Sequence, residues 1–92
     1  MKNNPIKSVS KKINNIQIRK MKTKWGSCNP NTKNINLHIE LIKKPKICIK
    51  YVIFHELAHL IYPNHSKEFY CYLTCYMSDW QKRKELLEKP NI

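Results

Sequence analysis

The sequence predicts an α+β fold, in which a small antiparallel sheet of two to three strands packs on a helix carrying the motif H-E-x-x-H and on a backing helix. Apolar residues first alternate with polar ones and then recur at three- and four-residue spacing, so strands precede helices. The length of 92 residues, without internal repeats, allows a single domain with one modest core.

The first predicted strand lies in the segment "INNIQIRKMKTKW". Ile16, Ile18 and Met21 nearly alternate with polar residues as this segment runs toward Trp25. Gly26, the only glycine of the chain, then opens the segment "GSCNPNTKN". This segment is rich in turn-forming residues, and we expect it to form a loop.

A second strand is predicted in "INLHIEL", where apolar and polar residues alternate without interruption. One face would carry Ile35, Leu37, Ile39 and Leu41, and the other Asn36, His38 and Glu40. We expect an antiparallel hairpin with the first strand. An exposed edge of this strand could bind a peptide as an added strand. Asn36 and His38 are therefore candidate substrate-binding residues.

Three helices are predicted after the strands. Apolar residues at helical spacing predict the first from Lys46 to about Tyr62, and Pro63 ends it because proline disfavours helical geometry in the preceding residue. Ser66 is expected to cap a second helix and Asp79 a short third one. The apolar stripe of the second helix would consist of Phe69, Leu73, Tyr76 and Met77.

The four cysteines are expected to be reduced thiols. No C-x-x-C pair is present, and the N-terminus lacks the apolar segment of a secretory signal, which predicts a cytoplasmic protein. Cys71 and Cys75 lie one helical turn apart and could share a metal. Burial on a helix face is the favoured interpretation, because free cysteine is among the most buried residue types.

The formal net charge of +12 is concentrated in residues 1–50, which hold 13 of the 18 basic residues and only one of the six acidic ones. Residues 1–12 are predicted to form a basic flexible arm, and residues 13–92 a single domain. A basic half suggests an acidic partner such as nucleic acid. Codon bias is the alternative, because Lys, Ile and Asn all have A/T-rich codons. No apolar run is long enough to span a membrane.

The segment "HELAHLIYPNH" carries the strongest functional signal. On a helix, His55 and His59 project from one face a turn apart and can bind one Zn²⁺, while Glu56 flanks that face and can reach a water on the metal. This is the H-E-x-x-H arrangement of zinc hydrolases, in which the glutamate is the general base.

A catalytic zinc also needs a third protein ligand and an open fourth position. Pro63 ends the helix and Asn64 tolerates a left-handed turn, so His65 could return to complete the site. The spacing H-E-x-x-H-x₅-H equals that of metzincins, although Tyr62 occupies their glycine position. We expect one zinc per chain, held by three histidines, with Glu56 transferring protons during peptide hydrolysis.

The order of several motifs resembles one family. "KTKWGSC", "INLHIELIKKP", "IKYVIFHELAHLIYPNHSKEF" and "MSDWQKRKELL" are similar to the YgjP-like metallopeptidase domain, which is related to SprT-like proteases. The resemblance implies a minimal zincin-like core, with His55, His59 and His65 as zinc ligands and Glu56 as the catalytic acid and base. The segment W-G-S-C, residues 25–28, also matches the family, and we expect it to form a packed turn against the site without a catalytic role.

The sequence departs from the family in two places: only a short basic arm precedes the first motif, and Ser78 replaces the usual proline. Homo-oligomerisation could close a cleft that a short N-terminal region leaves open. Two other functions stay open. One is a basic nucleic-acid-associated module, as for SprT-like proteases acting on DNA-linked proteins, and the other is a metal-dependent amide hydrolase acting on a small molecule.

Overall fold

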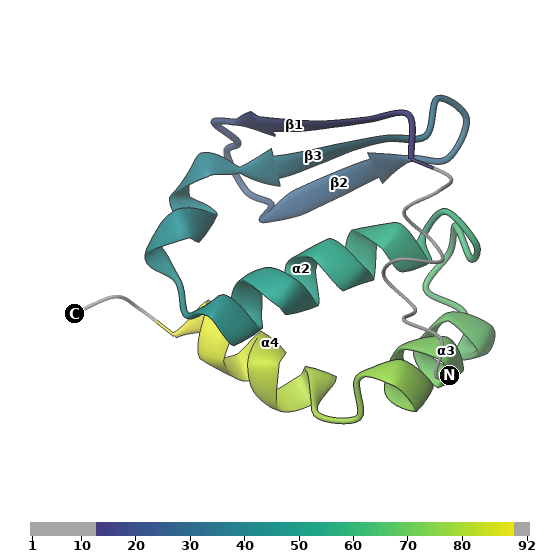
Figure 1. The fold of residues 1–92 in the computed structure, drawn as a ribbon. Helices are drawn as coiled ribbons and strands as arrows, with labels where there is room; N and C mark the ends of the chain where they lie inside the picture. The colour runs from purple at the N-terminus through teal and green to yellow at the C-terminus, as the bar shows by residue number, and fades with distance from the viewer. Residues whose placement is uncertain (1–12, 90–92) are drawn as a thin grey trace, which may run out of the picture.

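The computed structural model describes residues 13–89, so the predicted N-terminal arm lies outside the described residues. The α+β prediction is confirmed. A three-stranded sheet covers one side of a central helix, and two further helices cover its other side (Figure 1). In chain order the elements are β1 (Asn15–Arg19), β2 (Gly26–Asn29), β3 (Asn34–His38), the 3-10 helix η1 (Ile39–Lys43), α2 (Lys46–Ala58), α3 (Lys67–Tyr76) and α4 (Trp80–Glu88).

The sheet is mixed, and in this respect the predicted hairpin was wrong. The strand order is β1-β3-β2, with β1 parallel to β3 and β2 antiparallel to it. The segment expected to be a loop supplies β2, and the turn itself is confined to residues 29–33. There the Asn29 side chain accepts hydrogen bonds from two backbone amides, and Lys33 adopts a left-handed conformation with φ 63°.

β3 is the central strand, so both of its edges are paired and neither can receive a peptide. β3 also ends earlier than predicted. The His38 side chain accepts a hydrogen bond from the backbone amide of Glu40 and caps η1, which turns the chain out of the sheet. Ile39 is therefore 51% exposed, whereas Ile35 and Leu37 are buried against α2 as expected.

The hydrophobic core lies between the sheet and the three α-helices. α2 contacts β2 and β3 on one side and α3 and α4 on the other (Figure 1). The largest fully buried side chains are Phe54, Phe69, Ile35, Leu57, Leu73 and Cys48. α2 is therefore the element that holds the layers together.

The caps of the last two helices differ from each other. Ser66 caps α3 as predicted, since its hydroxyl accepts a hydrogen bond from the amide of Phe69. Asp79 precedes α4 but makes no side-chain capping bond, because its carboxylate is paired with Arg83 at 2.9 Å. Both elements start within a residue of where the sequence places them.

The buried face of α3 was only partly predicted. Phe69, Leu73 and Met77 are buried, and because they follow one another at four-residue spacing they define the packed face. Cys71 and Cys75 lie two residues out of this spacing and are exposed, so the expected burial of both was wrong. None of the helices within residues 13–89 combines the length and the hydropathy needed to span a bilayer.

Candidate active site

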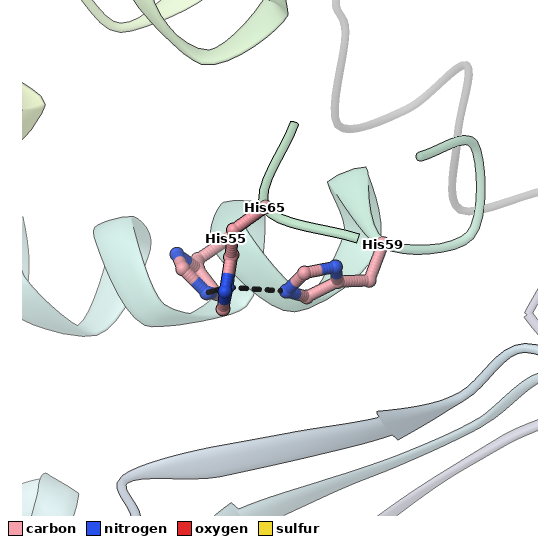
Figure 2. Close-up of side chains that lie close together, drawn as sticks. All are labelled: His55, His59 and His65. Atoms are coloured by element: carbon pink, nitrogen blue, oxygen red, sulfur yellow. Dashed lines mark hydrogen bonds between the residues drawn. The ribbon is translucent and has the colours of Figure 1, made fainter. Parts of the chain in front are cut away.

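Three histidine side chains meet at the C-terminal end of α2. His55 lies on the helix, His59 at its C-cap, and His65 on the loop that returns toward the helix (Figure 2). The Nε2 atom of His65 lies 3.0 Å from that of His59 and 3.3 Å from that of His55. One ring nitrogen of each histidine therefore points toward a shared centre.

The return of His65 depends on how α2 ends. The helix stops at Ala58 rather than at Tyr62, and the amide of Tyr62 bonds back to the carbonyl of Ala58 at 2.9 Å, which closes a final turn. Asn64 was expected to take a left-handed conformation, but Lys33 is the non-glycine residue with positive φ within residues 13–89. The chain thus reverses without a left-handed residue, and Ser66 then starts α3.

Hydrogen bonds fix the orientation of the rings. His59 Nδ1 lies 3.1 Å from the carbonyl oxygen of Tyr62, and since a carbonyl only accepts, Nδ1 carries the proton. The Nε2 atom of the neutral ring then presents a lone pair to the shared centre. His55 Nδ1 lies 3.5 Å from the hydroxyl of Tyr51, one turn earlier on α2. Burial lowers the pKa of His55 to about 4 and also lowers that of His59, which keeps both rings neutral at pH 7.

The three nitrogens fit a tetrahedral metal ion. Bonds of about 2.0–2.1 Å to zinc would place ligand nitrogens roughly 3.3 Å apart, and the two separations given above are close to that value. In the part of the chain from 13 to 89, these three histidines form the one group of at least three potential ligands. Three protein ligands leave a fourth position open, as in catalytic rather than structural zinc sites.

Glu56 lies beside this group and is buried, with 7% of its surface exposed. Burial raises the pKa of its carboxyl to about 7, while the nearby charge of Lys24 acts in the opposite direction. β2 passes directly over this side chain. A Cβ atom at Gly26 would lie 3.0 Å from Cγ of Glu56 and 3.1 Å from Cγ1 of Val52. Glycine at this position lets the strand lie against the carboxyl side chain, which gives the W-G-S-C segment a structural role.

Two cavities lie beside His55 and Glu56. The metal-side cavity, of about 360 Å³, is lined by Lys24, Gly26, Ser27, Cys28, Pro30, His55, Glu56, His59, Pro63 and His65. The α4-side cavity, of about 230 Å³, is lined by Thr23, Lys24, Trp25, Gly26, Tyr51, Val52, His55, Glu56, Lys84, Leu87 and Glu88. The residues that line both are Lys24, Gly26, His55 and Glu56. The two cavities therefore adjoin, with His55 and Glu56 where they meet, and we refer to them together as the trough.

The two predicted substrate-binding residues lie elsewhere. Asn36 donates a hydrogen bond from Nδ2 to the hydroxyl of Ser27 at 3.2 Å, and the ring of His38 packs 5.6 Å from that of Trp25. Neither residue lines the trough. The residues that sequence reasoning missed include Tyr51 and Lys84. Only Tyr51 had a signal, because it precedes His55 by four residues and so shares its helix face.

The family model of the YgjP-like metallopeptidase domain matches residues 4–90. The chain belongs to the YgjP-like metallopeptidase family. The crystal structure of the metallopeptidase zymogen abylysin from Pyrococcus abyssi is similar in fold, with a TM-score of 0.72 and 20% sequence identity over 89% of this chain and 80% of that chain. No curated protein sequence matches this one significantly.

Replacement of Gly26 by alanine should impair this YgjP-like domain through its contact with Glu56. The added methyl group would also lie 3.2 Å from the backbone oxygen of Asn36, so strand and side chain cannot both stay in place. We expect peptide hydrolysis to fall and the free energy of unfolding to drop by about 1–3 kcal/mol. Gln81→Ala is the control, because Gln81 is exposed on α4 and lines neither cavity. Equal activity in Gly26→Ala and wild type would show that the close contact is dispensable.

Stability of the metal-free domain should depend on pH through Glu56. Between pH 4.5 and 7 the unfolded chain releases the Glu56 proton while the folded chain retains it, so stability falls as pH rises through this window. Glu56→Gln removes this loss and should be more stable than wild type by about 3 kcal/mol at pH 8, with no advantage below pH 4.5. His55 has the opposite effect between pH 4 and 6.5, but it acts in both proteins and cancels. Urea unfolding at several pH values measures the difference, and a difference independent of pH would contradict the burial of this carboxyl.

Proposed function

We propose that this metallopeptidase domain is zinc-dependent, that His55, His59 and His65 hold the metal, and that Glu56 is the general base and acid. The observation that supports this most directly is the convergence of three Nε2 atoms in a cavity that Glu56 also lines. Imidazole ligands suit zinc and also copper, iron and nickel. Three ligands with an open position, beside a carboxyl group, fit zinc hydrolysis best.

When bound, the metal would polarise the carbonyl of the scissile bond and lower the pKa of a water molecule beside it. The chain's own residues would move the proton. Glu56 takes a proton from the water molecule while the water oxygen attacks the carbonyl carbon. Glu56 then gives this proton to the amine nitrogen as the C–N bond breaks. A nearby divalent cation favours the ionised carboxylate, which prepares Glu56 to act first as a base.

The trough also suggests how a peptide substrate would bind. β2 is an outer strand in the order β1-β3-β2, and residues of β2 line both cavities. An extended peptide could lie along this strand and be held by main-chain hydrogen bonds, which are largely independent of sequence. The carbonyl to be cleaved would then lie near Glu56 and His55, in the middle of the trough. This supports a peptide over a small-molecule amide as the substrate.

Glu56→Gln is the central test of this proposal. Glutamine has nearly the same shape but cannot accept the proton, so hydrolysis of casein and of a mixed peptide library should fall by about 10²–10⁴-fold. Metal content, measured by elemental analysis, should stay near one equivalent per chain. Glu68→Gln is the matched control, since this exposed carboxylate lies on α3 outside the trough, and its activity should equal that of wild type. Retention of more than a tenth of wild-type activity in Glu56→Gln would contradict the assigned role. Cleavage of small amides but of no peptide would favour the amide hydrolase.

Nucleic-acid association and homo-oligomerisation stay predictions from the sequence. DNA affinity that falls steeply with added salt would support the first, and the absence of binding at low salt would oppose it.

A further inference from the structure

The α4-side cavity has an apolar floor and a charged rim. Tyr51, Val52 and Leu87 are buried and form the floor, and the partly buried ring of Trp25 adds a wall. The rim carries Lys24 from the β1–β2 connection and Lys84 from α4, both exposed, together with Glu88. The two lysines come from opposite sides of the cavity, since one belongs to the sheet layer and the other to the helix layer.

Both lysines lie beside the residues at the middle of the trough. Lys24 lines both cavities, and Lys84 lines the α4-side cavity together with His55 and Glu56. The ion pairs within residues 13–89 are Lys43–Glu40 and Arg83–Asp79, so neither rim lysine has a carboxylate at ion-pair distance. The acidic member of the rim is Glu88, which is exposed, and Glu56 is a second carboxyl group in the lining. The rim itself thus carries two cations and one anion.

These features define which side chain the cavity suits. A short aliphatic stem would contact the floor, and a terminal carboxylate would lie near two ammonium groups that make no ion pair within residues 13–89. A lysine side chain in the cavity would be repelled by the ammonium groups of Lys24 and Lys84. The excess of basic residues over the whole chain acts in the same direction.

We propose that the α4-side cavity selects an acidic substrate residue next to the cleaved bond, with Lys24 and Lys84 as the specificity-determining residues; this inference rests on the proposed peptidase function. Antiparallel strand pairing is slightly the more stable kind. A peptide antiparallel to β2 passes the metal-side cavity first and the α4-side cavity second, because β2 runs from Gly26, which lines both, to Cys28, which lines only the first. The acidic residue therefore follows the cleaved bond.

Peptide binding to zinc-loaded Glu56→Gln tests the inference without requiring cleavage. Four fluorescein-labelled peptides would be identical except for Glu, Gln, Leu or Lys at one central position, and fluorescence anisotropy would give each dissociation constant. The Glu peptide should bind about tenfold more tightly than the Gln peptide and more tightly still than the Lys peptide, and this advantage should shrink with added salt.

Charge reversal on the rim locates the effect. Lys84→Glu, added to Glu56→Gln, should reverse the order so that the Lys peptide binds more tightly than the Glu peptide. Lys82→Glu is the matched control, because it makes the same change of net charge on an exposed position of α4 outside the cavity. The control should leave the preference for Glu intact.

Tightest binding of the Leu peptide, equal binding of all four, or no binding of any would overturn the inference. Equal effects of Lys84→Glu and Lys82→Glu would also overturn it, since they would reflect net charge alone. The proposed function is tested separately, by incubating the wild-type domain with a broad peptide library. If wild type cleaves nothing while the charge preference in binding holds, the peptidase proposal fails, and only the preference of the cavity for an acidic side chain stands.

Discussion

The site depends on the point at which α2 ends. Because the helix stops at Ala58 and the chain reverses before Ser66 starts α3, His65 approaches the two helical histidines instead of continuing around the helix axis. The same reversal places the carbonyl of Tyr62 where it accepts the Nδ1 proton of His59, which leaves Nε2 free to bind. One turn of backbone thus places the third histidine of the proposed metal site and fixes the ring orientation of the second. The orienting partner of a metal-binding histidine commonly matters nearly as much as the ligand itself.

The contact between β2 and α2 determines the environment of the carboxyl group. Gly26 lets the strand approach Glu56 so closely that a Cβ atom at this position would lie 3.0 Å from Cγ of Glu56. The burial of Glu56 raises the pKa of its carboxyl group to about 7. This value applies to the metal-free domain, and a bound divalent cation would favour the ionised carboxylate. The same strand lines the trough, so the element that buries Glu56 also carries the outer edge along which the proposed peptide would lie. The burial of Glu56, its protonation and the proposed peptide site therefore depend on one packing interface.

Much of this arrangement followed from local pattern. Helical spacing predicted that α2, α3 and α4 exist, and the Ser66 cap was also predicted. The end of α2 and the capping bond of Asp79 were not predicted correctly. The short range between His55 and His65 made one shared centre the natural interpretation of that segment. The pairing of the strands could not be predicted in this way. β1 pairs with β3, although β2 lies between them in the sequence, and only tertiary packing decides that order. The burial of Cys71 was predicted wrongly because it was inferred from the general tendency of free cysteine to be buried. The buried face of α3 is instead the one that carries Phe69. The rim lysines lie 60 positions apart and meet only through the fold, so the α4-side cavity had no signature in the sequence.

The most direct test of the account is the metal content of the purified domain and of His65→Ala, measured side by side by elemental analysis after exposure to zinc and gel filtration. Three convergent nitrogens predict about one zinc per wild-type chain and a large loss of zinc in His65→Ala, with His38→Ala, outside the cluster, retaining the wild-type amount. Circular dichroism would establish that both variants are folded. A folded wild-type domain that binds no zinc, or a His65→Ala variant that binds it as tightly as wild type, would contradict the three-histidine site.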